Sequence, residues 1–352
     1  MVGSTENKII NEDIDLIVAS DLDWDQLRDK TILVTGGAGF LASYIIKSLI
    51  KANEVHNLRL KVICLVRNLN NLDRLNHLRD NSILSIIKHD VTNPDFKSLT
   101  RSDFVIHSAS NASPKYFGVD PVGTLLANSF GTQNMLDYSL KSEAHKFLFF
   151  SSSEVYGDPV NKVDLIKEVD YGYLDPMQVR SCYAESKRVG ETMCSAWSSQ
   201  HGLHTSVVRP FHTYGPSMLL DDGRVFADLV SNVLNEKQIT LKSDGSSIRA
   251  FCYVRDSIEG IFRVLFNGKN SEAYNVGNPA QEISMKDLAL TLCRIFPEKN
   301  LTLEFDLDLD NTKYIKSEVN RSSPDITKVR SLGWNPQVNI EDGFKRTVLS
   351  YE

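Results

Sequence analysis

Short apolar runs recur along the first two thirds of the chain and alternate with segments of helical periodicity. The runs are nearly continuous and rich in β-branched or aromatic residues, which is typical of strands buried on both faces. Between the first two runs, Phe40–Ile50 carries apolar residues at helical spacing. This alternation predicts an α/β fold, in which helices cover both faces of a doubly wound parallel sheet. The predicted strands are Thr31–Thr35, Lys61–Val66, Ile83–Lys88, Phe104–His107, Phe147–Phe150 and Thr205–Arg209.

Changes in composition divide the 352 residues into three parts. Residues 1–29 mix acidic and apolar positions and predict a helical extension packed on the main body. Residues 30–209 contain the predicted strands. Turn-forming pairs such as Asp222-Gly223 become frequent after Pro210, so we expect residues 210–352 to form a smaller α/β lobe, interleaved with the first domain.

Charge and cysteine content exclude several classes of protein. The net charge of −6 gives no general attraction to nucleic acid or to anionic membranes. The chain shows neither a long apolar stretch nor a secretory signal, so we expect a cytoplasmic protein without a membrane partner. Its five cysteines are scattered and lack metal-ligand spacing, which predicts reduced thiols and no metal site.

A glycine-rich turn follows the first predicted strand. Thr35–Ala42 lies between a strand and a helix, which is the setting of a dinucleotide-binding fingerprint. Gly36 suits the tight turn and Gly39 the close approach of backbone to a pyrophosphate. Phe40 and Leu41 begin the helix, whose N–H groups favour phosphate. The turn predicts that residues 30–209 form a Rossmann-like domain that binds NAD or NADP.

Two later positions bear on the choice of cofactor. The second strand ends in Val66-Arg67, without the acid that normally binds the adenosine ribose. Arg67 either meets a 2′-phosphate, which would favour NADP, or stacks on adenine. Asp90 and Val91 follow the third strand, where Asp90 either contacts the adenine amino group or caps a turn.

Tyr183 and Lys187 form the sharpest catalytic signal, because a four-residue spacing places both on one helix face. A nearby cation favours the phenolate, so we expect Lys187 to lower the pKa of Tyr183 and make it a base. Ser152, Ser153 and Glu154 follow a central strand, at the edge where doubly wound sheets bind ligands. We expect Ser152 to bond the reacting sugar oxygen and Glu154 to act as a general base or to cap the next turn.

Together these motifs resemble the extended short-chain dehydrogenase/reductase family, in its nucleotide-sugar epimerase/dehydratase group, from about residue 30 to the C-terminus. Within that group the chain is most similar to UDP-glucuronate decarboxylases. The segments that carry this likeness are His107–Pro114, Ser152–Pro159, Arg180–Arg188, Asp222–Val225 and Arg249–Phe251.

The resemblance implies that the sugar is first oxidised at C4. Tyr183 would take the 4-hydroxyl proton, Lys187 would bind the nicotinamide ribose, and hydride would pass from C4 to the cofactor. The 4-keto sugar then loses carbon dioxide, loses water or returns as an epimer. Ser153 stands where dehydratases of the family usually place an acid, which weakens 4,6-dehydration. Decarboxylation is the first expectation, with 4,6-dehydration and 4-epimerisation as the alternatives.

The lobe formed by residues 210–352 offers candidates for binding the nucleotide sugar. Guanidinium groups match phosphate oxygens, which makes Arg224, Arg249 and Arg255 candidates for the diphosphate. Tyr116 is expected in a loop that lines the sugar site. Two positions depart from the decarboxylase pattern: His212 replaces an asparagine, and Arg321-Ser-Ser-Pro324 replaces Arg-Arg-Lys-Pro.

The oligomeric state and two competing functions remain to be considered. The resemblance implies a homodimer that pairs through long helices at Val122–Leu140 and Tyr183–Ser199. The competing functions are a ketone reductase that releases its cofactor at each turnover and a non-catalytic dinucleotide sensor. A sensor has no need of a base beside the nicotinamide, so Tyr183 and Lys187 argue against it.

Overall fold

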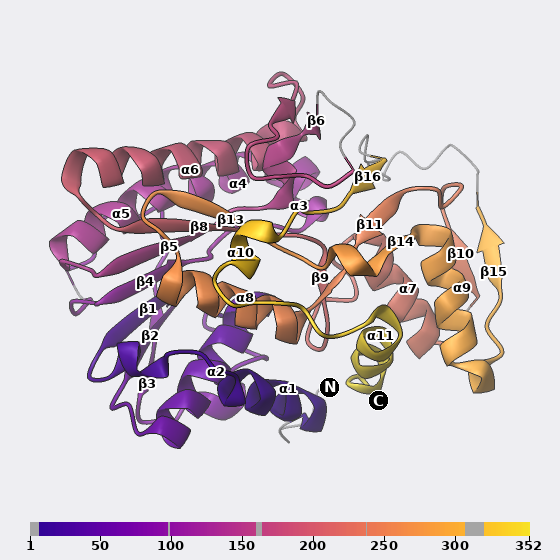
Figure 1. Ribbon diagram of the computed structural model, residues 1–352, viewed down its shortest axis with the longest axis horizontal. Helices are drawn as coiled ribbons and strands as arrows, with labels where there is room; N and C mark the ends of the chain where they lie inside the picture. The colour runs from indigo at the N-terminus through magenta and orange to yellow at the C-terminus, as the bar shows by residue number, and fades with distance from the viewer. Residues whose placement is uncertain (1–6, 98, 160–163, 237, 307–319) are drawn as a thin grey trace.

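The computed structural model describes residues 7–97, 99–159, 164–236, 238–306 and 320–352. Seven parallel strands form its central sheet, in the order β3-β2-β1-β4-β5-β8-β13. The doubly wound α/β prediction is therefore confirmed (Figure 1). The strands are β1 (Thr31–Thr35), β2 (Lys61–Val66), β3 (Leu84–Lys88), β4 (Phe104–His107), β5 (Lys146–Phe150), β8 (Thr205–Pro210) and β13 (Glu272–Val276).

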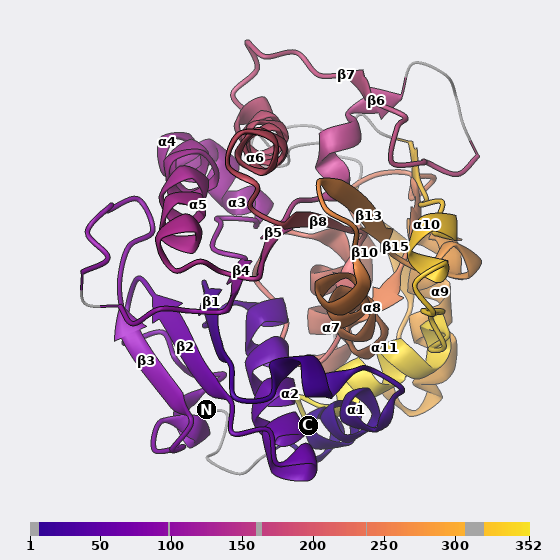
Figure 2. The ribbon, with the colours of Figure 1, turned by 60° about the vertical axis from the view of Figure 1, so that its left-hand side comes forward.

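Helices cover both faces of this sheet, because its strands are apolar on both sides. One core contains side chains of α1, α2 and α8, and the other contains side chains of α5 and α6 (Figure 2). On the first face lie α1 (Lys8–Ala19), α2 (Phe40–His56) and α8 (Val254–Asn267), and on the second α4 (Pro121–Asn128), α5 (Phe130–Lys141) and α6 (Ser181–His201).

The expected helix from Val122 to Leu140 is two helices. Ser129 separates α4 from α5 with φ −103° and ψ −76°, outside regular helical geometry. The periodicity continues across the break, so the sequence pattern alone predicts one helix.

A smaller lobe follows β8 (Figure 1). It is interleaved with the main domain, because β13 returns to pair with β8 in the central sheet. The lobe lies next to α3 (Pro114–Val119), where the Ser113 hydroxyl at the N-cap of α3 donates a hydrogen bond to the Asp222 carbonyl. Its own elements are β9 (Thr213–Tyr214), α7 (Val225–Leu234), β10 (Ile239–Leu241), β11 (Ile248–Ala250), β12 (Cys252–Tyr253), β14 (Glu282–Ser284), α9 (Met285–Ile295), β15 (Leu303–Phe305), β16 (Arg321–Ser322), α10 (Thr327–Arg330) and α11 (Ile340–Leu349).

Two short strands and a 3₁₀ turn come after β5 in the chain. The turn η3 (Ser153–Tyr156) follows β5, and β6 (Asp158–Pro159) pairs with β7 (Gly172–Tyr173). No helix among the described residues is long and apolar enough to cross a membrane.

Candidate active site

The glycine turn between β1 and α2 leaves room for a ligand's phosphates. Gly36 has φ +65°, and a Cβ there would stand 2.8 Å from Cα of Ala109. Gly39 is the N-cap of α2, and its N–H donates to the Gly36 carbonyl at 2.8 Å. Phe40 and Leu41 begin the helix, so their N–H groups lie at its positive end. This cradle fits the pyrophosphate of a dinucleotide.

The other predicted cofactor residues lie at the same edge of the sheet. Arg67 follows β2 and is exposed. Asp90 caps a turn, because its Oδ1 accepts hydrogen bonds from the N–H and hydroxyl of Thr92 at 2.9 and 2.8 Å. Val91 is buried, and its carbonyl accepts a hydrogen bond from Asn134 at 2.9 Å. A capping Asp90 keeps free carboxylate lone pairs, so the turn does not exclude contact with adenine.

Tyr183 and Lys187 lie in the first two turns of α6 and are buried beside the end of β5. Nζ of Lys187 donates to the Phe150 carbonyl at 2.6 Å and lies 5.7 Å from the Tyr183 ring centre. The hydroxyl groups of Tyr183 and Ser152 are hydrogen-bonded. The three side chains therefore meet at the carboxyl end of a central strand, where this fold binds ligands.

The pKa of Tyr183 differs from our expectation. Burial raises it to about 12, while the hydrogen bond to Ser152 and the charge of Arg224 act in the opposite direction. Burial also lowers the pKa of Lys187 to about 7, opposed by the charge of Glu191. The expectation of a lowered pKa for the Tyr183 phenol was wrong, because burial penalises both the phenolate and the ammonium that would stabilise it.

Ser153 and Glu154 form the start of η3, beside the catalytic pair. The hydroxyl of Ser152 caps this turn by accepting from the Glu154 N–H at 3.2 Å. The Glu154 carboxylate instead pairs with Arg180, whose Nη1 lies 3.2 Å from Oε2. Ser152 thus takes the capping role that the sequence left open for Glu154, and the carboxylate of Glu154 stays half-exposed at the site.

Three of the predicted substrate residues lie near one another. His212 has φ +28° and is partly buried, and its buried Nε2 has no hydrogen-bond partner among the described residues. Burial and the charges of Arg249 and Arg224 keep the pKa of His212 well below its usual value. Arg224 is held by Asp222 at 3.1 Å. Two cations around a neutral imidazole can bind an anion.

The remaining two substrate candidates have other neighbours. Arg255 forms an ion pair with Asp256, with Nε and Nη2 at 3.1 and 2.8 Å from Oδ1. Tyr116 lies in α3 rather than in a loop and is 37% exposed. The next residue, Phe117, stacks on Tyr183 with ring centres 5.0 Å apart. Phe117 was missed because one apolar residue in a short helix carries no sequence signal.

Several buried polar atoms around the catalytic pair fit a bound ligand. They have no hydrogen-bond partner among the described residues, although buried polar groups are normally paired. They belong to α4 or to the segments at the ends of β4, β5 and β8. These atoms are Nε2 of His107, Oγ of Ser110, Oδ1 of Asn128, Oγ of Ser151 and Nε2 of His212.

Comparison with known proteins points to one family. Residues 32–277 match the model of the NAD dependent epimerase/dehydratase family. The chain is 36% identical to UDP-glucuronic acid decarboxylase 6 of Arabidopsis thaliana over 315 residues, which are 89% of this chain and 86% of that protein.

Solved structures with the same fold carry related chemistry. A UDP-glucuronic acid 4-epimerase from Bacillus cereus, crystallised with UDP-glucuronic acid and NAD, is 26% identical with a TM-score of 0.77, covering 91% of this chain and 98% of its own. A dTDP-glucose 4,6-dehydratase from Streptomyces venezuelae, crystallised with NAD, is 25% identical with a TM-score of 0.75, covering 91% and 96%.

Proposed function

We propose that this chain, which belongs to the NAD dependent epimerase/dehydratase family, decarboxylates UDP-glucuronate through a transient 4-keto sugar. The observation that carries the proposal is its 36% identity to UDP-glucuronic acid decarboxylases over 89% of its length. The buried Tyr183–Lys187 pair beside Ser152 supports the same chemistry, because it sets a base next to a hydroxyl donor. The cofactor is NAD, as the family name states.

In the proposed mechanism, the residues of the chain move protons and hold the sugar. NAD, when bound, supplies the acceptor and donor of hydride. Tyr183 takes the proton of the 4-hydroxyl group and later returns it, while Ser152 donates a hydrogen bond to the same oxygen. Lys187 holds the nicotinamide ribose, and its ammonium form favours the Tyr183 phenolate.

The residue at position 153 bears on the step after oxidation. The 4-keto sugar with a C6 carboxylate is a β-keto acid: its C5–C6 bond breaks, carbon dioxide leaves, and the electron pair of that bond forms an enolate. The enolate takes a proton at C5 from water, so the step needs no strong protein acid. Elimination of a C6 hydroxyl as water needs a proton donor, and the Ser153 hydroxyl is too weak an acid for that role. This difference favours decarboxylation over the 4,6-dehydration that a similar protein is named for, and the higher identity to decarboxylases favours it over 4-epimerisation.

Arg224, Arg249 and His212 are proposed to hold the diphosphate. The charges of Arg224 and Arg249 both act on the partly buried His212 ring, where an anion would be stabilised by both guanidinium groups. In the segment that departs from the decarboxylase pattern, Ser322 pairs in register with Arg249. Arg249 therefore lies beside the position of the missing arginine and is proposed to take over part of its role.

A homodimer in the cytoplasm completes the proposal. Large apolar side chains of α4, among them Val122 and Leu125, are exposed on the same side of the sheet as Val189 of α6. Such a surface is typical of an interface between subunits. The five cysteines are free in the structure, which fits a reducing compartment.

The first test is a product assay with purified protein, NAD and UDP-glucuronate, followed by mass spectrometry. We expect the nucleotide sugar to lose the mass of carbon dioxide and the Tyr183→Phe variant to form no product. Loss of the mass of water from dTDP-glucose would instead establish a dehydratase, and a product of unchanged mass with a new sugar NMR spectrum would establish an epimerase.

The same assay separates the remaining alternatives. A reductase that releases its cofactor would consume NADH stoichiometrically with a ketone, whereas the proposed cycle regenerates NAD. A sensor without chemistry would bind NAD and leave both UDP-glucuronate and dTDP-glucose unchanged.

A further inference from the structure

The catalytic turn after β5 is held by three arginines: Arg180 at the N-cap of α6, Arg188 within α6, and Arg209 in β8. The turn comprises residues 152–157 and contains the proposed catalytic Ser152 and Glu154. Three consecutive residues of this turn each accept a hydrogen bond from a different guanidinium group. The contacts are Arg180 Nη1 to Glu154 Oε2 at 3.2 Å, Arg188 Nε to the Val155 carbonyl at 2.7 Å, and Arg209 Nη1 to the Tyr156 hydroxyl at 2.8 Å.

Arg209 is fixed more completely than a typical arginine. Its side chain is 1% exposed, and it donates five hydrogen bonds, which is the full capacity of a guanidinium group. Two go to Glu191 at 2.8 and 2.6 Å, in the bidentate geometry of strong ion pairs. The others go to the hydroxyls of Tyr156 and Tyr171 and to the carbonyl of Glu168, each at 2.8 Å.

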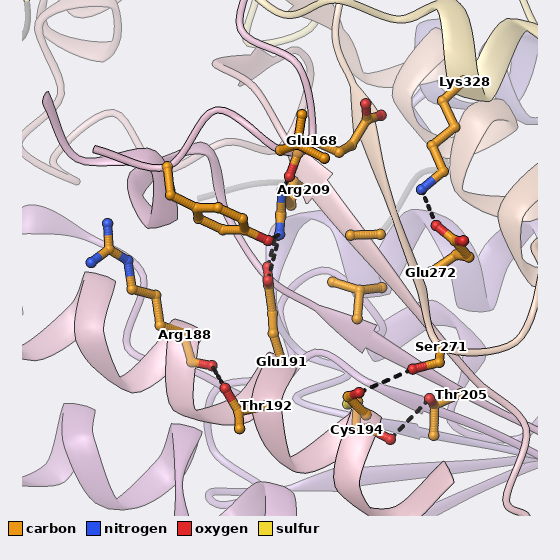
Figure 3. A pocket seen from close by; sticks show the side chains of 15 residues that line it. Glu168, Arg188, Glu191, Thr192, Cys194, Thr205, Arg209, Ser271, Glu272 and Lys328 are labelled. Carbon is orange, nitrogen blue, oxygen red and sulfur yellow. Dashed lines mark hydrogen bonds and ion pairs between the residues drawn. The ribbon is translucent and has the colours of Figure 1, made fainter. Parts of the chain in front are cut away.

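Glu191 connects this arginine to the helix that carries the catalytic pair. It lies four residues after Lys187 in α6 and therefore on the same face of the helix. Figure 3 shows Glu191 of α6 bonded to Arg209, with Arg188 on the same helix. All three side chains line a pocket of about 450 Å³. The catalytic helix and the catalytic turn are thus joined through side chains behind the proposed site.

Tyr156 extends the connection to the far strand of the sheet. It is 1% exposed, and its hydroxyl donates to Oδ1 of Asn275 in β13 while it accepts from Arg209. The amide of Asn275 donates to the Ile166 carbonyl at 2.8 Å. A hydroxyl that both donates and accepts has one orientation, so Tyr156 cannot shift without breaking buried hydrogen bonds.

We propose that Arg188, Arg209, Glu191 and Tyr156 are positioning residues, which hold the turn of Ser152 and Glu154 at a fixed distance from Tyr183 and Lys187. The inference rests on the proposed function, because it takes the side chains of the turn and of the catalytic pair as the reacting groups. The positioning residues act through the backbone of the turn and through α6. Reactions of this kind are sensitive to displacements of about 1 Å, which can reduce the rate by about 100-fold.

The test compares Tyr156→Phe with Tyr138→Phe. Each substitution removes one buried tyrosine hydroxyl, but that of Tyr138 bonds to the Thr100 carbonyl, away from the catalytic turn. We expect Tyr156→Phe to reduce kcat about 10- to 100-fold with a KM within threefold of the parent protein. Tyr138→Phe should lose a similar amount of thermal stability and keep its kcat.

A second variant guards against misfolding of the first. Arg188→Lys keeps the charge but loses the guanidinium group that contacts both the Val155 and Gly172 carbonyls, at 2.7 and 2.8 Å. We expect it to reduce kcat less than Arg188→Ala does, with both variants binding UDP-glucuronate as the parent does.

Tyr183→Phe distinguishes failure of the inference from failure of the proposed function. If Tyr183→Phe is inactive while Tyr156→Phe and Arg188→Ala keep the parental kcat, the positioning role is wrong and the proposed function stands. If Tyr183→Phe is as active as the parent, the proposed site is wrong and the positioning role falls with it.

Discussion

At the scale of single residues, Gly37 shows how tightly the cofactor turn is packed. A Cβ at this position would stand 2.2 Å from Sγ of Cys64 in β2 and 2.9 Å from Cδ1 of Ile46 in α2. Real Cβ atoms essentially never approach neighbours so closely. The sequence motif pointed to Gly36 and Gly39, whereas the need for glycine at position 37 comes from a side chain on the neighbouring strand.

We predict that Gly37→Ala destabilises the protein by about 1–3 kcal/mol, as overpacking does in tight cores. Because Cys64 Sγ is the nearest atom, Cys64→Ala in the same chain should restore part of the loss. Urea unfolding of the single and double variants measures both effects. Gly118→Ala is the control, since a Cβ there meets nothing within 4 Å. Equal stability of the single and double variants would contradict this explanation.

At the scale of elements, α1 joins the two halves of the molecule. Its Asp13 is 1% exposed and accepts hydrogen bonds from the Tyr253 hydroxyl at 2.7 Å and from Arg346 of α11 at 2.9 Å. The hydroxyl of Tyr44 in α2 lies 3.4 Å from the same carboxylate. The N-terminal extension therefore contains a packed helix, whose buried Asp13 contacts both α2 and the C-terminal lobe. Residues 1–6 lie outside the described part of the chain.

We predict that Asp13→Ala lowers the free energy of unfolding by about 2–4 kcal/mol, because it removes the buried acceptor shared by Arg346 and two tyrosine hydroxyls, while Arg346 keeps its ion pair with Glu12 at 3.1 Å. Asp15→Ala is a matched control on the same helix. Asp15 is 58% exposed and pairs with Lys51 at 2.9 Å, so its loss should cost less than about 1 kcal/mol. Similar melting temperatures for the two variants would show that α1 does not join the lobes as described.

The breaks between elements were harder to predict than the elements themselves. β1, β2 and β4 begin and end where the apolar runs do, since strands buried on both faces leave little ambiguity. The boundary between α4 and α5 at Ser129 has no glycine or proline to mark it. Backbone conformation there depends on packing against α6, which no local pattern contains.

At the scale of the whole molecule, the proposed dimer depends on apolar side chains that one chain leaves exposed. Val122 of α4 is 63% exposed and Val55 of α2 is 57% exposed, on opposite faces of the sheet. Within the described part of the chain, α4 exposes Val122, Leu125 and Leu126 beside Val189 of α6, whereas the neighbouring helices α1 and α2 expose one such side chain each, Leu16 and Val55.

We predict that Val122→Asp weakens the dimer and that Val55→Asp leaves it intact, because a charge buried in an interface costs far more than one in water. Sedimentation or light scattering of both variants at micromolar concentration measures the mass. A monomeric parent protein, or dimers of equal strength in both variants, would contradict the proposed interface.

The sequence by itself determined six of the seven strands of the sheet, all but β13, together with the glycine turn and the spacing of Tyr183 and Lys187. These features depend on local periodicity and on residues close in the chain, so their signal is in the order of the amino acids. Tertiary structure decided what lies around them: the high pKa of Tyr183, the stacking of Phe117 and the joining of Glu191 to Arg209. Burial and contacts between distant segments produce these effects, and neither exists until the chain has folded.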